Sequence, residues 1–251
     1  MIFFLTYHKV RGPAGVDDGD FYTVSSERLG RQIEAMHARG FKCLQVDNLL
    51  EGKTTAENEY ILGFDDATPD HYDVVFPLLK KHGCRAVFFV PTSRLNQPGF
   101  LTEAQVREMA RAGHTIGLHS HNHQRLDVLP PEKIREEMVR SQEILGGILG
   151  RKPVIFAPPG GFINGQVREA AVEQGVRIIR SMRWGYNQKP ELLDMETVPI
   201  NRYTNEKKFL RIMESRNPRI LYAGKEALKR LIPLRFYQMI RRLAFKFSKS
   251  E

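Results

Sequence analysis

This 251-residue sequence has little tryptophan, little cysteine and no long apolar run. It contains one tryptophan and two cysteines, Cys43 and Cys84, both inside apolar segments, which excludes a disulfide-dense secreted scaffold and favours buried thiols in a reducing compartment. Because every apolar run is shorter than about 18 residues, we expect no membrane-spanning helix. The first residues lack a basic leader and a small-residue cleavage site, so they predict a strand and not a signal peptide. Together these absences favour a cytoplasmic protein.

Positive charge is concentrated at the C-terminal end of the chain. The formal net charge is +9, and residues 219–251 carry nine Lys and Arg against two Glu. Apolar residues recur there at helical spacing beside the cations, which predicts a basic amphipathic helical tail, residues 218–251, after a domain of residues 1–217. Such a helix suits an anionic membrane surface, and the alternative is a terminal helix packed on the domain. No recognisable nucleic-acid-binding module accompanies the charge, so we expect no nucleic-acid partner.

Strand-like and helix-like segments alternate along the domain. The strands are short, continuously apolar runs, which is typical of a parallel sheet covered on both faces. They are predicted at residues 1–8, 41–46, 60–65, 86–90, 114–118, 154–156, 176–179 and 197–200. Helices between them begin at capping residues such as Thr102 and Asn164. The alternation predicts an α/β fold, and polar residues at the strand ends, without a glycine-rich phosphate loop, favour a barrel over an open doubly wound sheet.

Two clusters of polar residues each follow directly after an apolar run. Asp65 and Asp66 form the first cluster, and His119 and His123 belong to the second. The carboxyl ends of barrel strands share one face, so we expect these side chains to meet. One carboxylate and two imidazoles make the ligand set of an open zinc site, which leaves positions for water and substrate. The alternatives are a solvated acidic loop and an accidental histidine cluster, and the intervening His121 is expected to point away from a metal.

Two short motifs carry a resemblance to a known family. They are Phe64-Asp65-Asp66 and His119-Ser120-x-x-His123. In identity, order and spacing they resemble the first two motifs of the polysaccharide deacetylase family, carbohydrate esterase family 4, and the resemblance extends over about residues 2–200. It implies a distorted (β/α)7 barrel of the polysaccharide deacetylase type. It also implies a divalent metal bound by Asp66, His119 and His123, with Asp65 as the general base.

The resemblance further implies a hydrolase that removes an N-acyl group, most simply acetyl, from an amino sugar in a glycan or a lipid-linked glycan precursor. Zinc suits the ligand types, and another divalent transition metal is the alternative. A second class of function is a catalytically weakened carbohydrate-binding protein that retains the metal site. The missing export signal and the basic tail favour a cytoplasmic enzyme, peripheral on the inner membrane, that acts on its sugar before export.

The later motifs of the family are degenerate in this chain. Ala157 stands where the family has an arginine, although Gly160 in the same turn still offers an N–H for an oxyanion hole; a simple tight turn is the alternative. Trp184 resembles the fourth motif and is predicted either to wall the acyl groove or to pack in the core. The fifth motif lacks its histidine. His8, at the end of the first strand, is therefore predicted as general acid, with His71 as second candidate and a structural role as the alternative.

Overall fold

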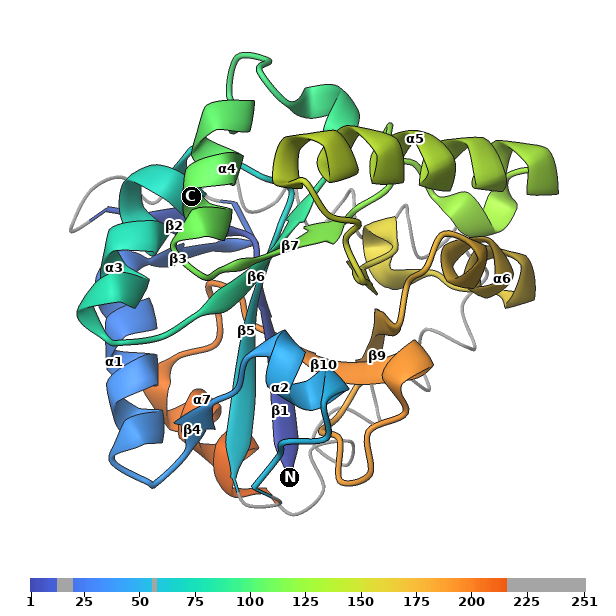
Figure 1. Ribbon diagram of the computed structural model, residues 1–251. Helices are drawn as coiled ribbons and strands as arrows, with labels where there is room; N and C mark the ends of the chain where they lie inside the picture. The colour runs from blue at the N-terminus through green and yellow to red at the C-terminus, as the bar shows by residue number, and fades with distance from the viewer. Residues whose placement is uncertain (13–19, 56–57, 216–251) are drawn as a thin grey trace, which may run out of the picture.

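The computed structural model describes residues 1–12, 20–55 and 58–215, and within these ranges a parallel sheet closes into a barrel (Figure 1). The ring runs β1, β10, β9, β8, β7, β6, β5 and closes because β5 also pairs with β1. Its strands are β1 (Ile2–Tyr7), β5 (Glu59–Asp65), β6 (Ala86–Val90), β7 (Thr115–Leu118), β8 (Ile155–Phe156), β9 (Ile178–Trp184) and β10 (Met195–Pro199). The predicted seven-stranded barrel is confirmed, whereas the predicted tail, residues 218–251, lies outside the described residues.

Helices surround the barrel, and most of them connect successive strands (Figure 1). They are α1 (Ser26–His37), α3 (Phe76–Lys81), α4 (Glu103–Arg111), α5 (Pro131–Leu149), α6 (Gly165–Glu173) and α7 (Glu206–Glu214). As predicted, the side chains of Thr102 and Asn164 cap α4 and α6 by accepting hydrogen bonds from backbone N–H groups in the first turn. Among the helices in the described ranges, none is long and apolar enough to cross a membrane.

The second predicted strand, residues 41–46, is largely wrong. Only β4 (Lys42–Cys43) is a strand, and it pairs with β5 outside the closed ring. A short helix, α2 (Val46–Leu50), follows directly. Leu44 and Leu49 are buried in the hydrophobic cluster inside the barrel, so the apolar pattern of this segment runs from the short strand into the helix. A separate parallel pair, β2 (Lys9–Arg11) and β3 (Thr23–Ser25), completes the strands.

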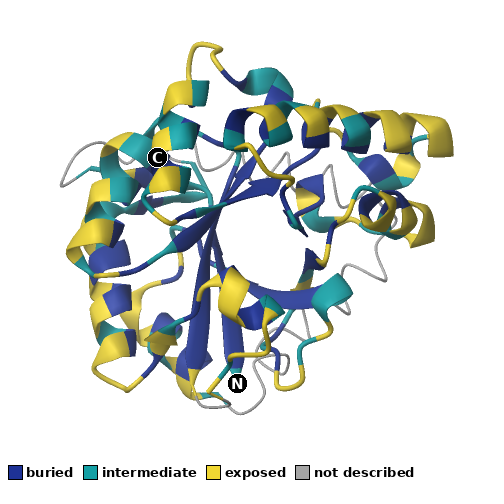
Figure 2. Cartoon of the chain, viewed as in Figure 1, coloured by how far each residue is buried: buried dark blue, intermediate teal, exposed yellow. Residues whose placement is uncertain are grey.

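Two hydrophobic clusters fill the molecule, one between the barrel and the helices and one inside the barrel. Figure 2 shows the strands as buried and the outer faces of the helices as exposed. The interior cluster contains two large rings, Phe4 and Phe89. Gly63 and Gly117 leave room for them, since a Cβ at either glycine would lie 2.6 Å from Phe4 or 2.7 Å from Phe89. Because alternate residues of a strand face the interior, the inward rows that start in this cluster continue to the polar residues at the strand ends.

Candidate metal centre and catalytic site

The predicted site residues lie at the C-terminal face of the barrel. Asp65 ends β5 and Asp66 follows it, while His119 follows β7 directly. Asp66, Ser120 and His123 have positive φ angles of 83°, 59° and 57°, in the left-handed region that residues other than glycine rarely adopt. Such backbone strain clusters at functional sites, and here it occurs directly after two strands, at or next to the predicted metal ligands.

Asp66, His119 and His123 converge as predicted. Asp66 Oδ1 lies 2.7 Å from His123 Nε2 and 3.5 Å from His119 Nε2. Ligand atoms around a tetrahedral zinc with bonds of about 2.0–2.1 Å lie about 3.3 Å apart, so this N₂O donor set fits a divalent ion with positions left open. Burial by itself would raise the pKa of Asp66, but the two imidazoles outweigh burial and hold that pKa far below its usual value. No other such cluster of potential metal ligands occurs in the part of the chain that the structure describes.

Two neighbouring histidines are oriented by their hydrogen-bond partners. His119 Nδ1 donates to the carbonyl oxygen of Ala157 at 2.6 Å, which leaves the Nε2 lone pair directed at the metal position. His121 Nδ1 instead lies 2.8 Å from Thr92 Oγ1. His121 therefore points away from the metal ligands, and its predicted orientation is confirmed.

The hydrogen bond from Arg94 favours a tautomer of His123 that cannot bind a metal through Nε2. A guanidinium only donates, so Arg94 Nη2, 3.2 Å from His123 Nδ1, makes that nitrogen an acceptor. The neutral ring then carries its proton on Nε2, directed at Asp66 Oδ1. A metal that binds through His123 Nε2 requires the proton on Nδ1, and the Arg94 hydrogen bond must open.

Glu137 of α5 holds in place the loop of residues 119–123, called here the histidine loop. Its Oε2 accepts hydrogen bonds from the backbone N–H groups of His121 and Asn122, at 2.9 and 2.8 Å. Glu137 is 6% exposed, so its buried carboxylate depends on these N–H donors and not on water. Glu137 was not among the residues predicted from the sequence. The signal available was its place beside Ile134 and Met138 on the buried face of the helix, where an unpaired acid is unusual.

Asp65 forms a buried ion pair with Arg180. Arg180 Nη2 donates to both carboxylate oxygens, at 2.7 Å to Oδ1 and 2.6 Å to Oδ2. The two side chains are 1% and 6% exposed, with Arg180 the more buried, and the guanidinium lies 5.0 Å from the centre of the Phe89 ring. Burial by itself would raise the pKa of Asp65, but Arg180, His119 and His8 together lower it. Asp65 is therefore held ionised in a fixed orientation.

Arg180 supplies a guanidinium from another strand. The third family motif supplies none here, because Ala157 stands at the position of its arginine. Arg180 comes from β9, two residues after Ile178, whose side chain is buried in the barrel interior. The strand predicted from the sequence ends at residue 179, whereas β9 continues to Trp184. Extending the two-residue period of the strand from Ile178 places residue 180 in the interior, and that was the signal for Arg180.

His8 lies beside the predicted base. Its Nε2 is 3.9 Å from Asp65 Oδ2, and its ring packs on Tyr22 with ring centres 4.5 Å apart. Its Nδ1 is buried and has no hydrogen-bond partner among the described residues. Burial lowers the pKa of His8 more than the carboxylates of Asp65 and Asp66 raise it. The structure thus places His8 next to Asp65 and the metal cluster.

The second candidate acid, His71, lies outside the site. It is fully buried between the rings of Phe64 and Phe88, which belong to the cluster on the helix side of the sheet. Its Nε2 donates to the backbone carbonyl of His8 at 2.6 Å. His71 therefore supports the backbone of His8 and does not face the metal ligands.

Gly160 and Trp184 lie near the same end of the barrel. Gly160 has a φ of 68° in the turn after β8, three residues beyond the carbonyl that binds His119. Trp184 is the last residue of β9, and it is partly buried against the outer hydrophobic cluster. Their predicted contacts with a substrate stay predictions.

A closed parallel barrel with a His-His-Asp cluster and a paired carboxylate at its C-terminal face defines a candidate metallohydrolase. Residues 52–179, which are 128 of the 251 residues, match the family model described as polysaccharide deacetylase. The chain belongs to the polysaccharide deacetylase family.

Curated relatives carry names that agree with this family. A peptidoglycan-N-acetylglucosamine deacetylase of Bacillus cereus is 29% identical over 136 residues, which cover 53% of this chain and 60% of the relative. The peptidoglycan-N-acetylglucosamine deacetylase PgdA of Listeria monocytogenes is 30% identical over 129 residues, which cover 51% of this chain and 26% of the relative. The chain thus spans less than two thirds of the length of these relatives.

Solved structures share the fold. The Streptococcus pyogenes deacetylase PplD, in complex with acetate, aligns with a TM-score of 0.76 and 24% identity over 85% of this chain and 98% of its own. IcaB from Ammonifex degensii aligns with a TM-score of 0.74 and 22% identity over 84% of this chain and 95% of its own. These alignments extend the fold assignment well beyond residue 179, where the family match ends.

Proposed function

We propose that this protein is a metal-dependent hydrolase that removes an N-acyl group, most simply acetyl, from an amino sugar of a glycan. The observation that carries the proposal is the placement of ionised Asp65, paired with Arg180, beside a complete set of metal ligands. Membership of the family and the names of the relatives support the same reaction class.

Asp66, His119 and His123 would hold the metal through one carboxylate oxygen and two imidazole nitrogens. When bound, a divalent ion lowers the pKa of a water molecule and polarises the acyl carbonyl. We propose zinc because two imidazoles and one carboxylate, with positions left open, are its usual catalytic ligand set.

Asp65 would act as the general base that takes a proton from the attacking water. Its lowered pKa keeps it ionised at neutral pH, and Arg180 fixes the direction of both oxygens. The N–H of Gly160 would stabilise negative charge on the acyl oxygen, and Trp184 would line the acyl groove. His8 would take over the proton that Asp65 accepted from the water, since its Nε2 lies 3.9 Å from Asp65 Oδ2, and would pass it to the departing amine.

Acetate release from an N-acetylated chitooligosaccharide tests this function. We expect the metal-loaded protein to release acetate, and Asp65→Asn to bind the metal normally but lose about two to four orders of magnitude in rate, the usual scale for a general base. If the wild type binds both metal and sugar without releasing acetate, the carbohydrate-binding alternative replaces the enzyme. If Asp65→Asn turns over normally, Asp65 is not the base.

We also propose that the substrate is presented at an anionic membrane surface, as a lipid-linked precursor. This proposal rests on the sequence of residues 218–251, which carries seven of the nine net positive charges together with residues of apolar periodicity. Co-sedimentation with anionic and neutral vesicles tests it. The full chain should prefer anionic vesicles and lose that preference in high salt, and a chain truncated before residue 218 should not bind. Equal binding by both chains contradicts the proposal.

A further inference from the structure

Three aromatic rings lead away from His8 at the C-terminal face of the barrel. The ring of Tyr22 lies 4.5 Å from the ring of His8 and 5.1 Å from that of Phe21, between ring centres. The ring of Tyr203 follows, 5.9 Å from that of Phe21. Tyr203 is 57% exposed, and the other two rings are partly buried. Single exposed apolar side chains are ordinary, but these three rings, called here the aromatic platform, are contiguous and reach the candidate catalytic site.

The aromatic platform is carried by two short turns that are joined to each other. The backbone N–H of Arg202, next to Tyr203, donates to the carbonyl oxygen of Phe21 at 3.1 Å, which ties the turn after β10 to the turn before β3. Within the turn before β3, Asp20 Oδ1 accepts from the backbone N–H of Tyr22 at 3.0 Å. The backbone under the rings is therefore ordered before a ligand arrives, which lowers the entropy lost on binding.

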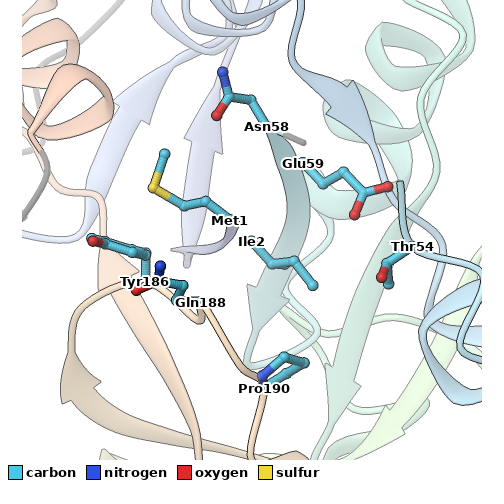
Figure 3. Close-up of a pocket in the computed structure, with 8 residues that line it drawn as sticks. All are labelled: Met1, Ile2, Thr54, Asn58, Glu59, Tyr186, Gln188 and Pro190. Carbon is cyan, nitrogen blue, oxygen red and sulfur yellow. The ribbon is translucent and has the colours of Figure 1, made fainter. Parts of the chain in front are cut away.

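The pocket shown in Figure 3 is not reached from the catalytic site. Its volume is about 360 Å³, and its lining includes Ile2 and Glu59, which begin β1 and β5. Asp65 ends β5, so at about 3.3 Å per residue the pocket lies roughly 20 Å from it along the strand. The aromatic platform instead starts at His8, whose Nε2 is 3.9 Å from Asp65 Oδ2. A glycan with one sugar unit at the metal ligands can extend over the platform but not into this pocket.

Aromatic rings and sugar rings have complementary surfaces. The face of an aromatic ring is negative, and one face of a pyranose ring presents C–H groups that are weakly positive. Resting on the proposed function, we infer that the aromatic platform binds the sugar units that follow the one held at the metal centre. Tyr22 would contact the nearer unit and Tyr203 a more distant one. The protein then prefers a glycan chain of several units to a short fragment.

Titration calorimetry on the full chain, with fully N-acetylated chitobiose and chitopentaose, tests the inference. A chelator keeps metal from the catalytic centre, so the titration measures binding without turnover. We expect the wild type to bind the pentaose at least tenfold more tightly than the biose, because only the longer chain reaches Tyr203. Equal affinities for the two lengths overturn the inference.

Variants locate this preference for the longer chain. Tyr203→Ala should reduce it at least fivefold, and the exposure of Tyr203 makes the substitution compatible with folding. Tyr203→Phe keeps the ring and should keep the preference. Val172→Ala is the control, because it also removes an exposed apolar side chain but lies near the C-terminal end of α6. A preference that survives in Tyr203→Ala, or that Val172→Ala loses equally, overturns the inference.

Acetate release by the zinc-loaded protein separates this inference from the proposed function. If the wild type releases acetate but binds both lengths equally, the inference fails and the proposed function stands. If the wild type releases no acetate, yet prefers the pentaose and loses that preference in Tyr203→Ala, the platform stands as a glycan-binding surface and the proposed function fails.

Discussion

Replacing Arg180 with methionine removes the partner of the buried Asp65 while keeping a side chain of similar length. Arg180 is 1% exposed and Asp65 6% exposed, so water does not replace the lost guanidinium. Deleting one member of a buried, hydrogen-bonded ion pair destabilises a protein by about 3–5 kcal/mol. We expect a loss of this size in the free energy of unfolding, measured by urea denaturation with the fluorescence of Trp184, the single tryptophan of the chain.

A double-mutant cycle separates the ion pair from simple loss of packing. Asp65→Asn leaves Arg180 buried and unpaired, so it should also destabilise, whereas the double variant contains neither charge. The two losses should therefore not add, and we expect a coupling energy of roughly 2 kcal/mol or more. Additive losses, or a loss below about 1 kcal/mol for Arg180→Met, would refute the reasoning.

The same variant also changes the pH dependence of catalysis. Arg180 is the largest of the effects that lower the pKa of Asp65, so its removal raises that pKa. A general base acts in its ionised form, and the rate falls as the pH drops through its pKa. The acid limb of the pH–rate profile should therefore move to higher pH in Arg180→Met.

Four further predictions concern the metal ligands, their surroundings and one buried histidine. His119→Ala should fold but lose stoichiometric metal, which metal analysis after dialysis checks; full retention would remove His119 from the site. Arg94→Met should bind zinc roughly tenfold more tightly, measured in competition with a chelating dye. The substitution removes a nearby positive charge, and it allows His123 to carry its proton on Nδ1, as metal binding through Nε2 requires. Glu137→Gln should weaken zinc binding in the same assay and lower stability by about 1–3 kcal/mol, since it accepts fewer hydrogen bonds from the histidine loop; an unchanged affinity would show that the loop holds itself. Burial lowers the pKa of His114 to about 4. Between about pH 6.5 and 4 the histidine is therefore protonated in the unfolded chain but not in the folded one, so the free energy of unfolding decreases by roughly 2–3 kcal/mol as the pH is lowered through this range. Urea midpoints at about pH 7.5 and 4.5 should differ less in His114→Gln than in the wild type, and an equal difference contradicts the assignment.

The metal ligands were predictable because their signal is local. Asp66 and His119 each follow an apolar strand directly, and parallel strands bring their carboxyl ends to one face whatever the details of packing. The closed barrel was predictable from the family resemblance, while strand–helix alternation alone leaves an open sheet possible. Neither the metal ligands nor the barrel required knowledge of the register between strands.

Residues that act across the barrel were not predictable from local pattern. Arg180 reaches Asp65 over 115 positions of sequence, and Glu137 binds a loop from a neighbouring helix. Both are single charged residues within otherwise ordinary elements, and their partners depend on register and tilt. The strand predicted at residues 41–46 was wrong for a different reason. The strand ends at Cys43, and the apolar residues after it are buried inside the barrel at the start of a helix, so their pattern does not mark a strand.

The most direct test of the account is acetate release measured while zinc is added stepwise to the metal-free protein, with an N-acetylated chitooligosaccharide as substrate. We expect the rate to rise in proportion to zinc and to level off at one ion per chain, because Asp66, His119 and His123 form a single site. Acetate release that does not depend on added metal, or a fully loaded protein that releases none, would contradict the proposed function.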